Sequence, residues 1–541
     1  MIQNKIWRWP LACALAFSAA AWSEAVSLER NQAEVQAVTF KNPVVWADVP
    51  DPDVIRVGDY FYMVSTTMHL MPGAPVMRSK DLVNWETVSY LFDKLHETPK
   101  YDMEEGTVYG RGQWATSLRY HDGRFYALFS PNVPYRSFVY TTDDPAKGWT
   151  LHSRMKHFHD ASLFFDDDGR VYVFSGTGAL TELEPDLSGV KEGGVNMTLQ
   201  VRDEEEKGLL EGSRVIKHDG KYYLLMISWP NGGKRRQLCY RADKITGPYE
   251  KKVILCDNFA GFPYVGQGTI VDDAKGNWYG VIFQDRGGVG RVLTLSPCHW
   301  IDGWPMLGDE DGRVPETMEV PVKGGPVIPL VVGDEFDGDK LKMEWQWNHN
   351  PVDEAWTLKE HKGFLRLKTN KVVSNLYEAR NTLTQRMEGP ECSGSLALEV
   401  GGMKDGDRAG LAAFNGHSGI LTVEKEGKDL FLVMSEEVVS LTDKEKKVTG
   451  VERKECARVK LPRTKKVYLR VDADFRLKRD IAEFYYGMDG KDWTKIGSDF
   501  KMRFDYRKLF MGTKFGIFNY ATKSAGGYVD VDYFRYEKAE K

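Results

Sequence analysis

The chain has few cysteines, no long apolar segment beyond its first two dozen residues, and little net charge. Six cysteines in 541 residues are too sparse for a disulfide framework. No later stretch reaches the ~18 apolar residues that a membrane-spanning helix needs. A formal net charge of −5 at pH 7 gives no reason to expect a polyanion as partner. Neither nucleic acid nor a membrane is therefore expected as a partner.

The N-terminal segment has the plan of a secretory signal. Lys5 and Arg8 precede an apolar run and then a series of small residues, with cleavage expected after Ala21 or Ala25. We assign residues 1–25 to this signal and expect an exported protein, periplasmic or extracellular. Its removal leaves an odd and sparse set of cysteines that still allows a disulfide bridge: Cys239, Cys256, Cys298, Cys392 and Cys456.

Few stretches show the 3.6-residue apolar period of an amphipathic helix, so we expect little helix. The chain instead has 12% aromatic residues, 52 glycines and 23 prolines, which favours many short strands joined by tight turns. At this length we expect at least two domains, on the usual scale of roughly 100–200 residues each.

A glycine turn followed by an aromatic strand recurs along the first half of the chain. The copies begin at Gly58, Gly123, Gly169, Gly220 and Gly276, about 50 residues apart. A repeat of this length with several strands per unit is typical of a β-propeller, with one copy in each blade. The sequence therefore predicts an all-β protein whose residues 40–315 form a five-bladed propeller.

A connector punctuated by proline and glycine follows, over residues 316–332. Beyond it, runs such as 364–368, 430–434, 467–471 and 528–534 alternate apolar and polar side chains without the blade pattern. Half-buried strands of this kind pack most economically as two facing sheets. We expect a concanavalin-like β-sandwich over residues 333–541.

Three acidic residues lie at the edges of blade strands and are candidates for chemistry. Asp51 stands between two prolines, which hold it in a stiff turn. Asp160 precedes the apolar strand of the third copy, and Glu211 lies just before the fourth. Ordinary turn chemistry is the alternative for an Asp-Pro pair. Because loops of different blades meet at one central funnel, we expect the three carboxylates to meet there.

Two carboxylates on separate blades suit inverting glycoside hydrolysis. That reaction needs a base and a protonated acid roughly 6.5–9.5 Å apart, so that a water molecule fits between base and sugar. A third carboxylate near the acid raises its pKa by like-charge repulsion and keeps it protonated. The chain offers a candidate for each role.

Four sequence blocks together resemble glycoside hydrolase family 43, and most closely its β-xylosidases and α-L-arabinofuranosidases with a C-terminal sandwich. The blocks are residues 50–55, 79–85, 160–169 and 211–213, and residues 334–336 with 345–351 resemble the start of that sandwich. The resemblance implies that Asp51 is the general base, Glu211 the general acid, and Asp160 the residue that tunes and orients the acid.

The resemblance also implies residues that bind substrate or a cation. Arg286 resembles an arginine that reaches sugar hydroxyls, with an exposed loop charge as the alternative. Trp114 matches an aromatic wall for a sugar ring, with a buried blade tryptophan as the alternative. Many members place a cation-binding histidine at the propeller centre, where this chain has Gln267, whose oxygen could serve a hard cation such as calcium.

A separate hypothesis concerns the sandwich. Carboxylates from its first and last strands, Asp334 and Asp532, could come together and bind a structural calcium ion. Ordinary turn or surface acids are the alternative. The hydrolysis itself is expected to require no cofactor, because carboxylates carry both proton transfers.

Two other functions are alternatives to an inverting glycoside hydrolase. A sugar-binding propeller without chemistry would have no need of all three carboxylates, and all three are present. A retaining fructosidase-like enzyme would also have five blades, but the chain lacks an Asn-Asp-Pro-Asn-Gly start.

The sequence therefore predicts an inverting hydrolase that acts on oligosaccharides derived from xylan or arabinan. A long insertion at residues 98–113 would close one side of the funnel, and a closed pocket releases one terminal sugar at a time. The residues do not distinguish terminal xylose from terminal arabinofuranose.

Overall fold

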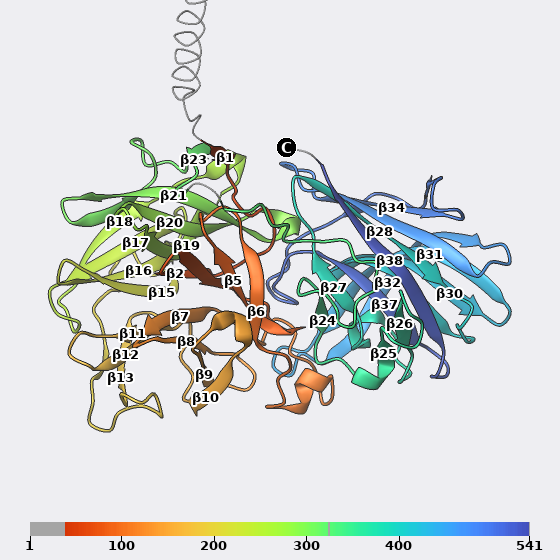
Figure 1. Cartoon of the computed structure of the whole chain (residues 1–541), viewed down its shortest axis with the longest axis horizontal. Helices are drawn as coiled ribbons and strands as arrows, with labels where there is room; N and C mark the ends of the chain where they lie inside the picture. Colours follow the sequence, from red (N-terminus) through yellow and green to blue (C-terminus); the bar gives the residue numbers. More distant parts are fainter. Residues whose placement is uncertain (1–37, 264, 323–324, 540–541) are drawn as a thin grey trace, which may run out of the picture.

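The computed structural model describes residues 38–539 apart from 264, 323 and 324, so the predicted signal segment lies outside it. Two β bodies lie side by side: the propeller on the left of Figure 1 and the sandwich on the right. The predicted all-β fold, a five-bladed propeller followed by a concanavalin-like sandwich, is confirmed. Helix among the described residues consists of six 3-10 turns: Pro99–Asp102, Pro145–Lys147, Phe259–Gly261, Gly287–Val289, Asp353–Ala355 and Leu376–Glu378.

Five four-stranded antiparallel sheets form the blades. Blade 1 has β2 (Asp53–Val57), β3 (Tyr60–Val64), β5 (Gly73–Ser79) and β6 (Glu86–Phe92). Blade 2 has β7 (Thr116–His121), β8 (Arg124–Phe129), β9 (Ser137–Thr142) and β10 (Thr150–Met155). Blade 3 has β11 (Ser162–Phe165), β12 (Val171–Ser175), β13 (Ala179–Leu183) and β14 (Asn196–Thr198). Blade 4 has β15 (Leu209–His218), β16 (Lys221–Trp229), β17 (Arg236–Ala242) and β18 (Glu250–Leu255), and blade 5 has β19 (Val265–Asp272), β20 (Trp278–Asp285), β21 (Arg291–Ile301) and β22 (Trp304–Leu307).

The recurring glycine forms the turn between the first two strands of every blade. All five of these glycines have positive φ, from 59° at Gly58 to 84° at Gly276. A left-handed turn of this kind favours glycine because a Cβ would crowd the following carbonyl. The predicted correspondence of one sequence copy to one blade is therefore confirmed.

The propeller closes into a ring. The innermost strands β2, β7, β11, β15 and β19 each contact the next, and β19 contacts β2. Outside the blades, β1 (Thr39–Lys41) pairs with β23 (Thr317–Glu319), so part of the predicted connector is bound to the start of the propeller.

Two eight-stranded sheets form the sandwich. The first sheet consists of β24 (Gln346–Asn348), β27 (Leu383–Arg386), β29 (Asp407–Phe414), β30 (His417–Glu426), β31 (Asp429–Leu441), β32 (Val448–Lys460), β37 (Lys514–Ala521) and the edge strand β4 (Leu70–Met71). Its strands lie in the order β32-β31-β30-β29-β37-β27-β24-β4. The second runs β25-β26-β38-β28-β33-β34-β35, with β36 also on β34: β25 (Trp356–Thr357), β26 (Leu365–Lys368), β28 (Glu391–Glu399), β33 (Lys466–Asp474), β34 (Ile481–Gly487), β35 (Thr494–Lys495), β36 (Phe500–Lys501) and β38 (Tyr528–Lys538).

One strand crosses from the propeller into the sandwich. β4 leaves blade 1 and pairs with β24, where Leu70 faces Asn348 and Met71 faces Trp347. The edge strand of the sandwich is thereby covered by the other domain, which removes an exposed sheet edge. This pairing fixes the sandwich next to the first blade, where Asp51 lies.

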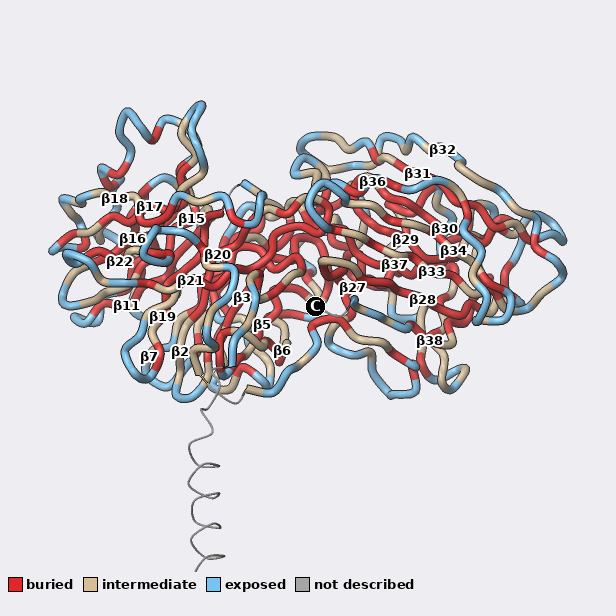
Figure 2. Tube along the Cα trace, turned by 90° about the horizontal axis from the view of Figure 1, so that it is seen from above, coloured by how far each residue is buried: buried red, intermediate tan, exposed pale blue. Residues whose placement is uncertain are grey.

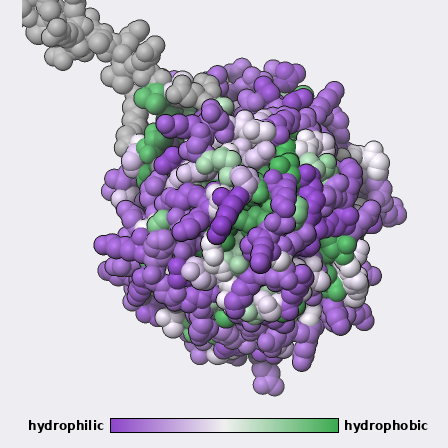
Figure 3. Space-filling view, turned by 90° about the vertical axis from the view of Figure 1, so that its right-hand side faces the viewer, coloured by the Kyte–Doolittle hydropathy of each residue, from purple (hydrophilic) through white to green (hydrophobic). Residues whose placement is uncertain are grey.

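Each of the two domains has a buried interior. In Figure 2 the buried segments run through the interior of each body and continue between them, while exposed segments lie on the outer loops. Figure 3 shows the free end of the sandwich as a mainly hydrophilic surface with small hydrophobic patches. Within the described part of the chain, the five cysteines that follow the predicted signal are all free, and none of the helices is long and apolar enough to span a membrane.

Candidate active site

Each blade places one of the predicted residues at the beginning of its innermost strand. Asp51 precedes β2, Trp114 precedes β7, Asp160 precedes β11, Glu211 lies in β15 and Gln267 in β19. Every blade has the same up-and-down order starting from the inside, so these five positions face one mouth of the propeller. Residues far apart in sequence are thus brought to one site.

Asp51 is held from two sides. Its backbone is left-handed, with φ of 55°, and its side chain is buried. Thr66 Oγ1 donates a hydrogen bond of 2.7 Å to Oδ2, and Arg291 Nη1 lies 3.1 Å from Oδ1. A charge-assisted bond from a buried arginine is among the strong ones, so the orientation of this carboxylate is fixed.

Glu211, Asp160 and His159 form a second group, in which one ligand atom from each lies within 4.8 Å of the others. Nε2 of His159 is 3.3 Å from Oε2 of Glu211 and 3.8 Å from Oδ2 of Asp160. Asp160 is only 7% exposed, whereas the Glu211 side chain is 31% exposed and so faces the solvent of the mouth. Sequence reasoning missed His159, although it directly precedes Asp160.

Burial raises the pKa of Asp160 to about 7. The positive charge of His159 lowers this pKa, and the negative charges of Glu211 and Asp51 raise it further. The hydrogen bond to Glu211 raises the pKa of His159 to about 9 against the cost of burial, and Asp160 adds to the rise. The group therefore holds at least one proton at neutral pH, next to the carboxylate that faces the solvent.

Trp114 lies where the resemblance placed it, at the mouth. Its half-buried ring is 5.8 Å from the His159 ring and 5.4 Å from the ring of Phe510, which comes from the sandwich. Trp114 Nε1 donates to the Gly110 carbonyl at 3.3 Å, which holds the ring in place. Its role as a wall for a sugar ring stays a prediction.

Arg286 is a buried residue, and its contact with sugar hydroxyls stays a prediction. Its guanidinium is buried 4.2 Å from the Phe262 ring, also faces Phe259 and Trp46, and donates from Nε to Gln284 at 2.7 Å. Burial lowers its pKa to about 10. The alternative of an exposed loop charge is wrong, because Arg286 is only 2% exposed.

Arg291, five residues later, contacts the predicted base Asp51. Arg291 is the first residue of β21, and its partner on the neighbouring strand β20 is Asp285. The same glycine-rich segment carries both arginines, and the sequence alone does not show that Arg291 contacts Asp51.

Gln267 lies at a bulge in β19, with φ of 49° and a buried side chain. A Cβ on Gly212 would lie 2.8 Å from Cδ of Gln267, so the amide packs directly beside the residue that follows Glu211. Nε2 of Gln267 has no hydrogen-bond partner among the described residues. The site offers one amide oxygen where the resemblance implies an imidazole, so a central cation stays a prediction and no step below uses one.

The two carboxylates proposed for calcium have other partners. Asp334 accepts hydrogen bonds from Trp345 Nε1 at 2.9 Å and from the Phe336 backbone N–H at 3.0 Å. Asp532 forms an ion pair of 2.8 Å with Lys466. Neither carboxylate belongs to a cluster of three candidate ligands in the described ranges. The structure thus gives this calcium site no support.

A buried arginine that the sequence analysis missed supports the mouth from below. Nη2 of Arg214, in blade 4, donates to the Asp51 carbonyl at 3.1 Å, and its Nε lies 3.6 Å from Asp53. The other oxygen of Asp53 accepts from Arg119 of blade 2 at 2.8 Å. These charges tie three blades together directly beneath the predicted base.

The sandwich completes one wall of the site. Asp48 accepts hydrogen bonds from the backbone of Arg291 at 2.9 Å and from that of Gly512, in the sandwich, at 2.8 Å. Nζ of Lys514 is 3.7 Å from Asp48, and burial lowers the pKa of this lysine to about 8. The segment that holds Arg291 against Asp51 is therefore fixed from the other domain.

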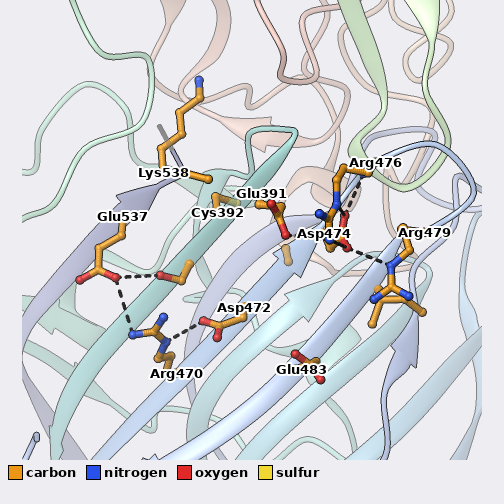
Figure 4. Close-up of a pocket in the computed structure, with 14 residues that line it drawn as sticks. Glu391, Cys392, Arg470, Asp472, Asp474, Arg476, Arg479, Glu483, Glu537 and Lys538 are labelled. Atoms are coloured by element: carbon orange, nitrogen blue, oxygen red, sulfur yellow. Dashed lines mark hydrogen bonds and ion pairs between the residues drawn. The ribbon is translucent and has the colours of Figure 1, made fainter. Parts of the chain in front are cut away.

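A separate charged groove of about 450 Å³ lies on the sandwich (Figure 4). Its charges pair with one another: Arg470 with Asp472 at 2.6 Å, and Arg476 and Arg479 with Asp474 at 2.6 and 2.9 Å. Because these ion pairs already satisfy the groove's arginines, we regard the groove as a structural feature of the sheet.

Comparison with known proteins agrees with this geometry. The model of "Glycosyl hydrolases family 43" matches residues 40–305, and that of "Beta xylosidase C-terminal Concanavalin A-like domain" matches residues 333–537. A putative β-xylosidase of Xylanibacter ruminicola is 34% identical over 68% of this chain and 73% of its own length. A non-reducing end α-L-arabinofuranosidase of Bacteroides ovatus, BoGH43B, is 29% identical over 79% of this chain and 83% of its own length.

A solved structure described as a bifunctional GH43-CE protein of Bacteroides eggerthii is 41% identical, with a TM-score of 0.85. The match covers 94% of this chain and 64% of that longer one. Both domains and their order are therefore shared with known members, and the chain is a glycosidase that belongs to glycosyl hydrolase family 43.

Proposed function

We propose that this glycosidase removes terminal xylose or arabinofuranose from xylan- or arabinan-derived oligosaccharides, with inversion and from the chain end. The observation that carries the proposal is the placement of Asp51 and Glu211 on different blades at one mouth, with Asp160 buried beside Glu211. The names of the relatives, β-xylosidase and non-reducing end α-L-arabinofuranosidase, support a terminal pentose as the substrate.

In the proposed reaction, Glu211 gives its proton to the glycosidic oxygen as the bond from that oxygen to the anomeric carbon breaks. Asp51 takes a proton from a water molecule whose oxygen forms the new bond to the anomeric carbon from the opposite face. Thr66 and Arg291 orient Asp51 for this step. Asp160 and His159 hold and position Glu211, and carboxylates carry both proton transfers without a cofactor.

Release of one terminal sugar at a time rests on how the insertion at residues 98–113 lies. The Thr107 backbone N–H donates to the Glu445 carbonyl at 3.2 Å, and Arg111 donates to the Asp443 carbonyl at 2.6 Å. The insertion is thus bound to the loop between β31 and β32 of the sandwich. Two domains that meet in this way favour a pocket closed on one side.

Export to the periplasm or the outside stays part of the proposal, because the segment that carries the signal lies outside the described residues. N-terminal sequencing of the protein purified from its natural host would test it. A mature N-terminus after Ala21 or Ala25 is expected, and an intact Met1 in the purified protein would contradict export by this signal.

Proton NMR of the first product tests the mechanism. We expect the anomer opposite to that of the substrate to appear first, and initial retention would overturn the assignment of Asp51 as base. Side-by-side hydrolysis of the p-nitrophenyl β-xyloside and α-L-arabinofuranoside would identify the pentose. Early release of long oligomers from a polymer would contradict attack at the chain end.

A further inference from the structure

A row of five aromatic rings crosses the mouth of the propeller: Phe510, Trp114, His159, His157 and Tyr135. The centroids of neighbouring rings lie 5.4, 5.8, 6.4 and 3.8 Å apart in that order. The first three spacings are typical of packed aromatic side chains, and the fourth belongs to a closely stacked pair. The row is therefore continuous from one end to the other.

The inner end of the row lies at the base and its middle lies at the acid. The Arg291 guanidinium, which contacts Asp51, is 4.9 Å from the Phe510 ring centroid. His159 contacts Glu211 at 3.3 Å. In the order of contacts along the row, His157 and Tyr135 follow the ring at the acid, and the ring at the base stands at the opposite end.

The outer end of the row is exposed. Tyr135 is 73% exposed, and its ring is stacked on His157 with an interplanar angle of 9°. Burial lowers the pKa of His157 to about 4, so the supporting imidazole is neutral at ordinary pH. One face of the tyrosine ring is covered by His157, which leaves the other face for a ligand.

The loop that carries Tyr135 lies on the side of the mouth. It joins β8 to β9, and Phe129 at the end of β8 pairs with Thr116 at the start of β7. The Val133 backbone N–H donates to the Arg111 carbonyl at 3.1 Å, which ties this loop to the insertion at residues 98–113. The tyrosine is thus presented from an anchored loop.

The order of the rings gives the row a direction. A general acid protonates the oxygen between the departing sugar chain and the sugar that is attacked. Whatever lies beyond the acid, as seen from the base, lies on the side of the leaving group. An exposed ring supported on one face suits the apolar face of a sugar ring, since aromatic side chains combine apolar area with a polar edge.

We propose that Tyr135, stacked on His157, forms a subsite for the leaving-group sugars of an oligosaccharide. The proposal rests on the proposed function for the direction of the row. It predicts that the exposed end of the row favours longer substrates, because these extend further on the side of the leaving group.

Substitution of the tyrosine tests the subsite. For Tyr135→Ala, we expect the ratio of kcat/KM for the pentose tetrasaccharide to kcat/KM for the disaccharide to fall about ten-fold, which corresponds to the loss of one stacking contact. Tyr135→Phe keeps the ring and should keep the ratio. Tyr120→Ala is the matched control, because Tyr120 is 45% exposed and its ring packs 4.8 Å from that of Phe125, but it lies at the far end of β7.

The subsite is overturned if Tyr135→Ala leaves the ratio unchanged or if Tyr120→Ala lowers it equally. A wild-type protein that hydrolyses neither substrate would overturn the proposed function instead. In that case calorimetric titration of the tetrasaccharide into the wild type and Tyr135→Ala still decides the subsite. Equal affinities would overturn it, and a weaker affinity for Tyr135→Ala would support it.

Discussion

At the scale of single residues, the three carboxylates differ in what surrounds them. Asp51 accepts hydrogen bonds from Thr66 and Arg291, whereas no described residue donates one to Asp160. Hydrogen bonds favour the charged form of a carboxylate, and burial without them favours the neutral form. One environment therefore suits a base and the other suits a residue that holds a proton beside Glu211.

Substitution of Glu211 by Gln and of Asp51 by Asn should each lower kcat by about 10²–10⁴-fold, because each supplies one half of the proton transfer. The amides are nearly isosteric, so both variants should keep the wild-type melting temperature within a few degrees. Steady-state kinetics on a natural oligosaccharide would measure the loss. A folded variant with near-normal turnover would refute the role of the substituted residue.

The residue scale also shows where sequence reasoning stops. Asp51, Asp160 and Glu211 could be predicted because each opens a blade, and blade openings converge. Arg291 was missed, because its contact with Asp51 joins residues 240 positions apart and no local pattern signals it.

At the scale of elements, local patterns predicted the blades, whereas long-range pairings escaped prediction. A glycine turn and an aromatic strand are encoded within a few residues, so five copies were enough to predict five blades. The pairing of β4 with β24 joins segments about 280 residues apart in the chain, and nothing local at Leu70 or Met71 signals it. The contact of Asp48 with Gly512 is hidden in the same way.

Two glycines of blade 4 make a matched pair for testing how the element positions the acid. Gly212 has φ of 77° and Gly220 has φ of 73°, but a Cβ would lie 2.8 Å from Gln267 at Gly212 and meets nothing within 4 Å at Gly220. Substitution of either glycine by Ala should lower the free energy of unfolding by about 1 kcal/mol, because alanine is strained in a left-handed backbone conformation. Only Gly212→Ala should also shift Glu211 and lower kcat/KM, by about ten-fold or more.

Urea unfolding and steady-state kinetics on both variants separate the two effects. Gly220→Ala serves as the control for backbone strain alone. Equal kcat/KM values for the two variants, at similar stability, would show that the packing of Gln267 against Gly212 does not position the acid.

At the scale of the whole molecule, the boundary between the domains contains buried ionisable groups. His69 lies there fully buried, its ring 5.1 Å from that of His349 and 4.7 Å from that of Tyr109. Neither nitrogen of His69 has a hydrogen-bond partner among the described residues. His349 accepts a hydrogen bond at Nε2 from the Val108 backbone N–H at 3.0 Å, so this nitrogen carries no proton. The boundary therefore requires both imidazoles to be neutral.

Burial lowers the pKa of His69 to about 3 from its ordinary 6.5, and that of His349 well below the same value. The unfolded chain takes up a proton at each histidine below about pH 6.5, and the folded chain does not. The stability contributed by the neutral histidines is thus fully present above pH 6.5 and is lost as the pH falls towards 3. At pH 5 the loss is about 2 kcal/mol for His69, and His349 adds to it in the same direction.

His69→Phe keeps a ring of similar shape and removes the titration. We expect the variant to match or exceed the wild-type stability at pH 7, because no hydrogen bond is lost, and to lose about 2 kcal/mol less than the wild type between pH 7 and pH 5. Urea unfolding at the two pH values measures the difference, with the exposed His299→Phe as control. An equally steep loss in His69→Phe and in the wild type would show that His69 does not contribute to acid sensitivity at the domain boundary.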